Sequence, residues 1–432
     1  MRDITPCRRE GQPPFCADPG KPPVHRIRPP RLLQDLATLR SFGAQGHGVV
    51  RPSLSPVDMQ ARRWLASRMS EAGLEPRIDG LGNVFGRSTR QGPALLAGSH
   101  SDTQPTGGWL DGALGVIVAL ETARALAEHP DTACLALDVV AWVDEESTFL
   151  SCMGSRAFCG LVSPQELAQA RNKAGQSLGD ALGAAGLDGA PAQHEPGRHI
   201  GYLEAHIEQG PHLEAAGQRI GVVTAIVGSR NITVDFAGQQ NHAGTTPMPL
   251  RRDAGLALMQ FGHRLHEVFR AEAGPKTVWT MGRLEVHPGA PSIIPGRAQL
   301  HLQFRDPDDA RLERLQACAQ ALADEMDQTG PVGVSMRPAS PPIRPAAMDE
   351  GLRRHLSAAA EAHAPGAWQA MPSAAVHDAM FLSSVMPAAM MFIPSIHGIS
   401  HDFAENSSDE DIVLGCQVFA DAAARILCAA RR

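Results

Sequence analysis

The chain has 432 residues, a formal net charge of -7 at pH 7, 43% hydrophobic residues and 20% charged residues. This composition is typical of a soluble globular protein, and the length predicts two domains. The acidic balance and the lack of a long basic stripe argue against a nucleic-acid partner. The sequence shows no secretory signal and no apolar stretch of the ~20 residues that a membrane span needs. We therefore expect a cytoplasmic protein with no membrane partner.

The eight cysteines are scattered along the chain and form no C-x-x-C pair. Several lie inside apolar stretches, where cysteine behaves as a small hydrophobic residue. We therefore expect reduced, buried thiols rather than a disulfide framework, as is usual for cytosolic proteins.

The first 28 residues are rich in Pro, Arg and Gly and have little periodic apolar pattern, which predicts a disordered extension. From residue 31 onward the apolar spacing predicts alternating helices and strands. Helices are expected at 32–39, 59–69, 113–126 and 412–426, and strands at 94–98, 134–143, 200–207 and 388–393. Such alternation predicts an α/β catalytic domain with a mostly parallel sheet, formed by residues 29–222 and 336–432.

The segment 223–335 has a different order of elements. Its patterns predict strands at 231–236, 277–286, 298–304 and 332–336, and helices at 250–269 and 312–326. The order β-α-β-β-α-β is that of a ferredoxin-like domain. We interpret 223–335 as a compact α+β domain inserted into the larger one.

Residues that can bind metal ions gather near the predicted ends of strands. They are His100 with Asp102, Asp111, the pair Glu145-Glu146, His206 and His401. In an open α/β sheet, the loops at the carboxyl ends of the strands converge on one crevice, so these side chains can meet in space. Imidazole and carboxylate ligands suit zinc, and also manganese, cobalt or nickel.

A pair of metal ions needs a bridging carboxylate and further ligands for each ion. Asp111 could bridge, with His100 and His206 on one ion and Glu146 and His401 on the other. A water between the ions would then be a nucleophile near neutral pH. Glu145 could take its proton as general base, and Asp102 could orient the ring of His100.

Each of these residues also has an ordinary structural explanation. Asp111 precedes a predicted helix and would be a good N-cap, and an adjacent pair such as Glu145-Glu146 is commonly solvated. A single loop histidine is usually part of the polar surface. The hypothesis of a metal site therefore depends on the joint placement of all five positions.

Six sequence segments, in order, resemble the M20-type metallopeptidase superfamily, and specifically its hydantoinase/carbamoylase branch. That branch contains allantoate amidohydrolases, N-carbamoyl-L-amino-acid hydrolases and β-ureidopropionases. The resemblance runs from about residue 31 to the C-terminus. The segments are Gly98-Ser99-His100-Ser101-Asp102-Thr103, Gly107-Gly108-Trp109-Leu110-Asp111-Gly112, Asp144-Glu145-Glu146, Glu204-Ala205-His206-Ile207-Glu208-Gln209-Gly210, Asn241-His242-Ala243-Gly244-Thr245-Thr246-Pro247-Met248 and Gly398-Ile399-Ser400-His401.

The resemblance implies a catalytic α/β domain and a ferredoxin-like lid that also forms a homodimer interface. It implies two divalent metal ions per subunit, held by the ligand set proposed above. It also implies that His242 stabilises the developing oxyanion, usually on the partner subunit's substrate. Arg305 falls where the family binds the substrate carboxylate, and Gln209 where it contacts the ureido or amide end.

Four positions depart from the family's pattern, and all lie near the expected substrate groups. Ser292 stands where the branch usually has Asn, Phe149-Leu150 where it has Arg and Phe, His397 where it has Asp, and Gln303 where it has Asp. None of these is a predicted metal ligand. We therefore count Ser292 among the substrate-binding positions and expect an intact hydrolytic site with an altered pocket.

The resulting hypothesis is an enzyme that hydrolyses C–N bonds other than peptide bonds. Its substrate would be a small carboxylate-bearing ureido or carbamoyl compound, such as an N-carbamoyl amino acid or allantoate. The alternative is a plain amide, as in an N-acyl amino acid. An inactive metal-binding scaffold would be expected to lack Glu145 or a ligand, and a phosphoesterase lacks support because there is no dedicated phosphate-binding loop.

Overall fold

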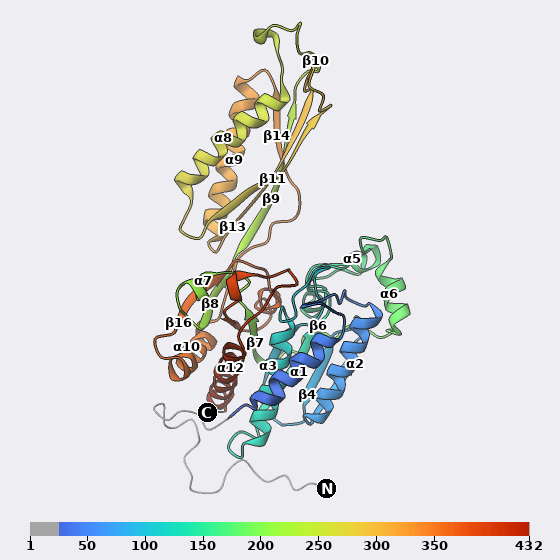
Figure 1. Cartoon of the computed structure of the whole chain (residues 1–432), viewed down its shortest axis with the longest axis vertical. Helices are drawn as coiled ribbons and strands as arrows, with labels where there is room; N and C mark the ends of the chain where they lie inside the picture. Colours follow the sequence, from blue (N-terminus) through green and yellow to red (C-terminus); the bar gives the residue numbers. More distant parts are fainter. Residues whose placement is uncertain (1–25, 432) are drawn as a thin grey trace. The chain divides into compact units, whose positions relative to one another are not determined.

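The structure is a computed structural model and describes residues 26–431 (Figure 1). Residues 1–25 of the predicted disordered extension lie outside the described part. The chain forms two compact units: one ends at Thr224 and resumes at Ala347, and the other comprises Ala225–Ala346. The sequence had placed these boundaries after residues 222 and 335.

The first unit is built on a large mixed sheet. Its strand order is β15-β8-β17-β7-β5-β6-β4-β3, and β16 pairs with β8. The bounds are β3 Leu74–Ile78, β4 Val84–Ser88, β5 Ala94–His100, β6 Ala136–Trp142, β7 His199–Ile207, β8 Ile220–Ile226, β15 Ala346–Ala347, β16 Trp368–Ser373 and β17 Ala388–Ile393. A two-stranded ribbon, β1 (Ala44–Gln45) and β2 (Gly48–Val49), lies outside it.

The prediction of a mostly parallel sheet was right only for the centre. Strands β17, β7, β5 and β6 run parallel to their neighbours in this group, whereas β8, β4 and β3 pair antiparallel. Every residue of β5, β6 and β17 is buried, as expected for parallel strands covered on both faces. Of the outer strands, β4 alternates between buried and less buried residues, whereas β3 is mostly exposed and β8 mostly buried.

Helices pack on this sheet through one continuous apolar core. Leucines of α1 (Pro29–Ser41), apolar residues of α3 (Ala113–Glu128) and the buried stripe of α12 (Asp409–Ala429) share it with the central strands. The remaining helices are α2 Pro56–Glu71, α4 Met153–Phe158, α5 Pro164–Gln169, α6 Leu178–Ala185, α7 His212–Ala215, α10 Glu350–His363, α11 Asp378–Leu382 and the 3-10 turn η3 Ile396–Gly398.

Helix α12 has the length and apolar composition of a membrane span, which the sequence patterns did not predict. It is the one such helix among residues 26–431. Its most apolar 18 residues are 67% buried within the protein, where they pack against the sheet and against α3 and α10. Burial of this kind is the mark of a core helix.

The second unit has one antiparallel sheet of order β11-β13-β9-β14. Two helices, α8 (Ala254–Glu272) and α9 (Asp309–Thr329), cover one of its faces and close an apolar core with it (Figure 1). The strands are β9 Gly228–Ala237, β11 Val278–His287, β13 Arg297–Asp306 and β14 Gly333–Pro338, joined by the turn η2 Met248–Leu250 and the short pair β10 Asn241–His242 and β12 Ile293–Ile294.

The order along the chain is therefore β-α-β-β-α-β. On β13, buried residues such as Leu300 and Phe304 face the helices and alternate with the less buried Gln299, Gln303 and Arg305. The uncovered face of this sheet is accordingly polar.

The cysteines are partly as expected. Cys152, Cys159, Cys318 and Cys416 are free thiols, and Cys152 and Cys416 are fully buried. Cys134 is disulfide-bonded, so the expectation of reduced thiols was wrong at that position.

Candidate metal centre

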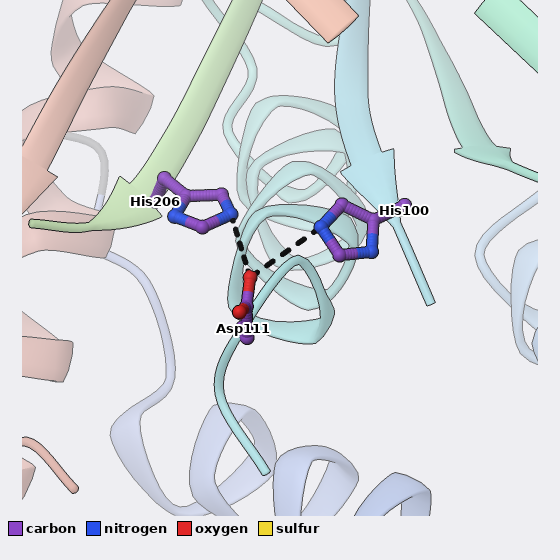
Figure 2. A group of neighbouring side chains, drawn as sticks. All are labelled: His100, Asp111 and His206. Carbon is purple, nitrogen blue, oxygen red and sulfur yellow. Dashed lines mark ion pairs between the residues drawn. The ribbon is translucent and has the colours of Figure 1, made fainter. Parts of the chain in front are cut away.

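Two histidines and one aspartate meet at the carboxyl ends of the central strands. His100 is the last residue of β5, His206 lies near the end of the neighbouring parallel strand β7, and Asp111 precedes α3. The Asp111 Oδ1 atom lies 3.2 Å from His206 Nε2 and 3.5 Å from His100 Nε2. Figure 2 shows the two rings directed at this carboxylate from either side. All three side chains are buried, and their ligand atoms lie within 4.8 Å of one another.

A second group shares the same aspartate. His401 Nε2 lies 3.3 Å from Asp111 Oδ2 and 4.0 Å from Glu146 Oε2. The ligand atoms of these three residues also lie within 4.8 Å of one another. Asp111 therefore offers one oxygen to each group, which is the arrangement that a carboxylate bridging two ions requires.

The ring orientations suit metal binding. His100 Nδ1 is 3.1 Å from the backbone oxygen of Asp102, and His206 Nδ1 is 2.9 Å from that of Ile207. A carbonyl oxygen only accepts, so both Nδ1 atoms carry the hydrogen. In the neutral rings, each Nε2 then carries the lone pair that a metal ion would use, and Nε2 of His206 accepts from the backbone nitrogen of Gly112 at 3.1 Å. Histidine ligands of metals are commonly oriented in this way.

The electrostatics of the cluster also favour a cation. Asp111 raises the pKa of His401 to about 9, and burial raises the pKa of Glu146 to about 7. Burial raises the pKa of Glu145 well above its usual range, and the neighbouring Glu146 adds to this effect. A divalent cation would take the place of protons held by these closely spaced groups.

Glu145 stands beside both groups but belongs to neither. Its Oε2 lies 3.7 Å from His100 Nε2, and its Oε1 accepts a hydrogen bond from the thiol of Cys152 at 3.5 Å. Its side chain is 12% exposed, so it is largely shielded from solvent but can still contact a bound substrate. This is a suitable place for a proton acceptor.

The loop that carries Glu145 and Glu146 is held by two aspartates. Asp144, in the left-handed region at φ 59, accepts hydrogen bonds from the backbone nitrogens of Thr148, Phe149 and Leu150 at 2.7–2.9 Å. Asp102 Oδ2 accepts one from the backbone of Glu146 at 3.1 Å. The carboxylate of Asp102 thus supports this loop, while its backbone oxygen orients His100.

Gln209 is in direct contact with the second metal group. Its Nε2 donates to Asp111 Oδ2 at 2.9 Å and lies 3.3 Å from both Ser400 Oγ and His401 Nε2. Gln209 and His401 are both in the left-handed region, at φ 58 and 54. Strained residues of this kind cluster at functional sites.

His242, Ser292 and Arg305 belong to the second unit. His242 is exposed, and the backbone nitrogens of Gly244 and Thr245 donate to its Nδ1 at 3.0 and 3.2 Å. The hydrogen of the neutral ring is therefore on Nε2, which makes this atom a donor. The Ser292 backbone oxygen accepts from Ala243, so these two positions are neighbours.

Arg305 does not lie near them. It pairs with Ser229 at one end of the β9–β13 ladder, while Arg297 pairs with Ala237 at the other, the end that leads into β10 and β12. The eight residue-to-residue steps from Arg297 to Arg305 span about 27 Å of extended strand. One copy of this unit therefore places His242 and Arg305 far apart.

Sequence reasoning missed two buried residues at the metal centre. Glu405 accepts hydrogen bonds from the loops of Asp111 and His401. His377 packs edge-on against His206, with ring centroids 4.5 Å apart, and its Nε2 lies 2.9 Å from Ser373 Oγ. Glu405 follows His401 by four residues, which is the signal that could have indicated it, whereas nothing in the sequence near His377 pointed to the site.

Comparison with known proteins places the chain in a family. Residues 96–425 match Peptidase family M20/M25/M40. The chain belongs to this family. It is 34% identical to the N-carbamoyl-L-amino acid amidohydrolase of Geobacillus stearothermophilus, over 91% of this chain and 97% of that protein. It is 34% identical to the allantoate amidohydrolase of Escherichia coli K12, over 90% and 96%.

Solved structures agree with this assignment. An amidase of the hydantoinase/carbamoylase family from Burkholderia phymatum superposes with a TM-score of 0.89 at 53% identity, covering 94% of this chain and 99% of that one. The resemblance to the M20 superfamily and its hydantoinase/carbamoylase branch is thus confirmed, as is the class of enzyme: a hydrolase of C–N bonds other than peptide bonds.

Proposed function

We propose that this protein hydrolyses a linear C–N bond in a small carboxylate-bearing substrate, either a ureido or carbamoyl compound or a related amide. The observation that carries the proposal is the pair of metal-ligand groups sharing Asp111, with Glu145 beside them. Relatives named for N-carbamoyl amino acids, allantoate and ureidoglycolate support this chemical class.

In this proposal the metal centre holds two divalent ions, zinc or manganese, with cobalt or nickel also compatible with the ligands. When bound, such ions would lower the pKa of a water and polarise the scissile carbonyl. Glu145 would accept a proton from the attacking water and deliver it to the leaving nitrogen. Gln209, whose amide reaches Asp111, orients the ureido or amide end of the substrate.

The second unit would supply the groups that bind the rest of the substrate. The guanidinium of Arg305 suits a carboxylate, and Nε2–H of His242 suits an oxyanion. Because one copy holds these two residues at opposite ends of β13, a small substrate cannot touch both within that copy. The complete site therefore combines residues of two subunits, and the second unit acts as a lid as well as a dimer interface.

The surface of the second unit supports such an interface. Exposed large apolar side chains concentrate there, including Met259 (63% exposed) and Leu256 on α8, and Leu284 (55% exposed) and Val286 on β11. Strand β11 is also an edge of its sheet. An apolar patch beside an unpaired strand edge is typical of a protein–protein contact. We also propose that the protein is located in the cytoplasm.

The test is a substrate panel on purified protein reconstituted with Mn²⁺ or Zn²⁺. N-carbamoyl amino acids and allantoate are assayed for ammonia, and N-acyl amino acids for free amine, since these release no ammonia. Ammonia from a ureido compound supports the first form of the proposal, and free amine alone supports the amide form. Hydrolysis of none of these compounds by metal-loaded protein would contradict the proposal.

A further inference from the structure

The structure assigns to Glu405 the role of a positioning residue that holds the Asp111 and His401 loops together and so preforms the Asp111–Glu146–His401 metal site. This inference rests on the proposed metal centre. Glu405 is in neither ligand group. Its carboxylate accepts hydrogen bonds from backbone nitrogens and from a serine hydroxyl.

One carboxylate joins the two loops. Glu405 Oε1 accepts from the backbone nitrogens of Leu110 and Asp111 at 3.1 and 3.0 Å. Glu405 Oε2 accepts from Ser400 Oγ at 2.7 Å, and Ser400 directly precedes His401. The three hydrogen bonds therefore fix two of the three chain segments that would present ligands to the second metal ion, namely those of Asp111 and His401.

The packing leaves this carboxylate little freedom. Glu405 is 1% exposed. A Cβ atom added at Gly108 would lie 1.9 Å from Glu405 Cδ, so the carboxylate rests directly on the backbone of Gly108. This explains why the segment before Asp111 needs glycine at that position. Three hydrogen bonds to a buried, immobile carboxylate define a single geometry for the two loops.

The second metal group needs such support more than the first. His100 and His206 lie at the ends of central strands and are almost fully buried. The His401 side chain is 50% exposed and comes from a loop, with a backbone in the left-handed region. Without Glu405, the loop of His401 would keep weaker ties to the Asp111 loop, such as the bond from Trp109 Nε1 to Asn406 Oδ1 at 3.3 Å.

The experiment measures metal binding without an activity assay. Metal-free wild-type protein, Glu405→Ala and Glu405→Gln are titrated with Mn²⁺, and free Mn²⁺ is read by electron paramagnetic resonance. We expect Glu405→Ala to bind one of the two Mn²⁺ ions about 10–100-fold more weakly, which is the usual effect of losing the residues that orient metal ligands. Its affinity for the other ion should equal that of wild-type protein. Glu405→Gln retains an acceptor for the two backbone donors and should stay within about threefold of wild type.

Asn406→Ala is the matched control, because it removes another link between the same two loops and should leave both affinities within about threefold. Ser400→Ala serves if Glu405→Ala does not fold, and should weaken the same ion by about 2–10-fold. The inference would be overturned if Glu405→Ala bound both Mn²⁺ ions as tightly as wild-type protein does. The same result in Ser400→Ala would overturn it where that variant is used instead. Equal weakening of both ions, or an equal effect of Asn406→Ala, would do so too. If wild-type protein binds no second Mn²⁺, the proposed metal centre itself fails.

Discussion

The two units present their functional residues in different ways. In the first unit, the predicted ligands His100 and His206 are buried at the ends of central strands, Asp111 is buried just before α3, and hydrogen bonds to the backbone fix the histidine rings. In the second unit, His242 is exposed on a two-residue strand, and Arg305 lies at the other end of the sheet. The candidate metal site is thus preformed in the first unit, whereas the substrate binding that we propose for the second unit would depend on assembly of two copies.

The largest effect is expected from Glu145, the proposed general base of the first unit. Glu145→Gln should lower kcat by about 10²-fold or more, because an amide cannot accept the proton of the attacking water. Metal content should stay at the wild-type level, since Glu145 belongs to neither ligand group. Metal analysis and steady-state kinetics measure both properties.

The adjacent residue provides the control. Glu146→Gln removes a predicted ligand and should lose metal as well as activity. If Glu145→Gln lost as much metal as Glu146→Gln, the assignment of Glu145 as base would be wrong.

A smaller effect is expected in the second unit, at the residue that would bind the carboxylate. Arg305→Ala should raise KM about 10-fold or more for a carboxylate-bearing substrate, since a hydrogen bond to a charged group contributes about 1.5–3 kcal/mol. An uncharged analogue should be affected much less. Arg297→Ala, on the same strand and face, is the matched control and should change neither KM. Equal losses for charged and uncharged substrates would count against this role.

The smallest effect concerns the support of Arg305. Gln303 Oε1 accepts from Arg305 Nε at 3.1 Å, and Gln303 Nε2 donates to Asn231 Oδ1 at 2.7 Å. Gln303→Ala should raise KM about 2–5-fold with kcat unchanged, the size of one ordinary hydrogen bond. Gln299→Ala, which removes a glutamine from the same strand and face, should have no effect on KM. A matching rise in that variant would show that Gln303 acts only through the stability of the sheet.

The sequence predicted the parts of this molecule that depend on local pattern. The apolar runs gave the central strands, and ligand residues beside their ends gave a metal site whose members the structure brings together. The antiparallel outer strands could not be predicted, because the direction of β4 or β8 depends on which neighbour each one meets. His377 was missed because it reaches the site through His206, which is distant in sequence. Glu405 lies close to His401 in sequence, but its bonds to the Asp111 loop could not be predicted because that loop is distant in sequence.

The family resemblance implies that His242 acts on the partner subunit's substrate, so that one site would need Glu145 of one subunit and His242 of the other. This proposal is tested most directly by mixing two inactive variants. Glu145→Gln and His242→Ala are each expected to lose about 10²-fold or more in kcat. Unfolded and refolded together, they should form mixed dimers in which one of the two sites has both native residues. The account predicts recovery of up to about a quarter of wild-type activity. No recovery, with mixed dimers demonstrated by mass spectrometry, would mean that both residues act within one subunit and would contradict the account.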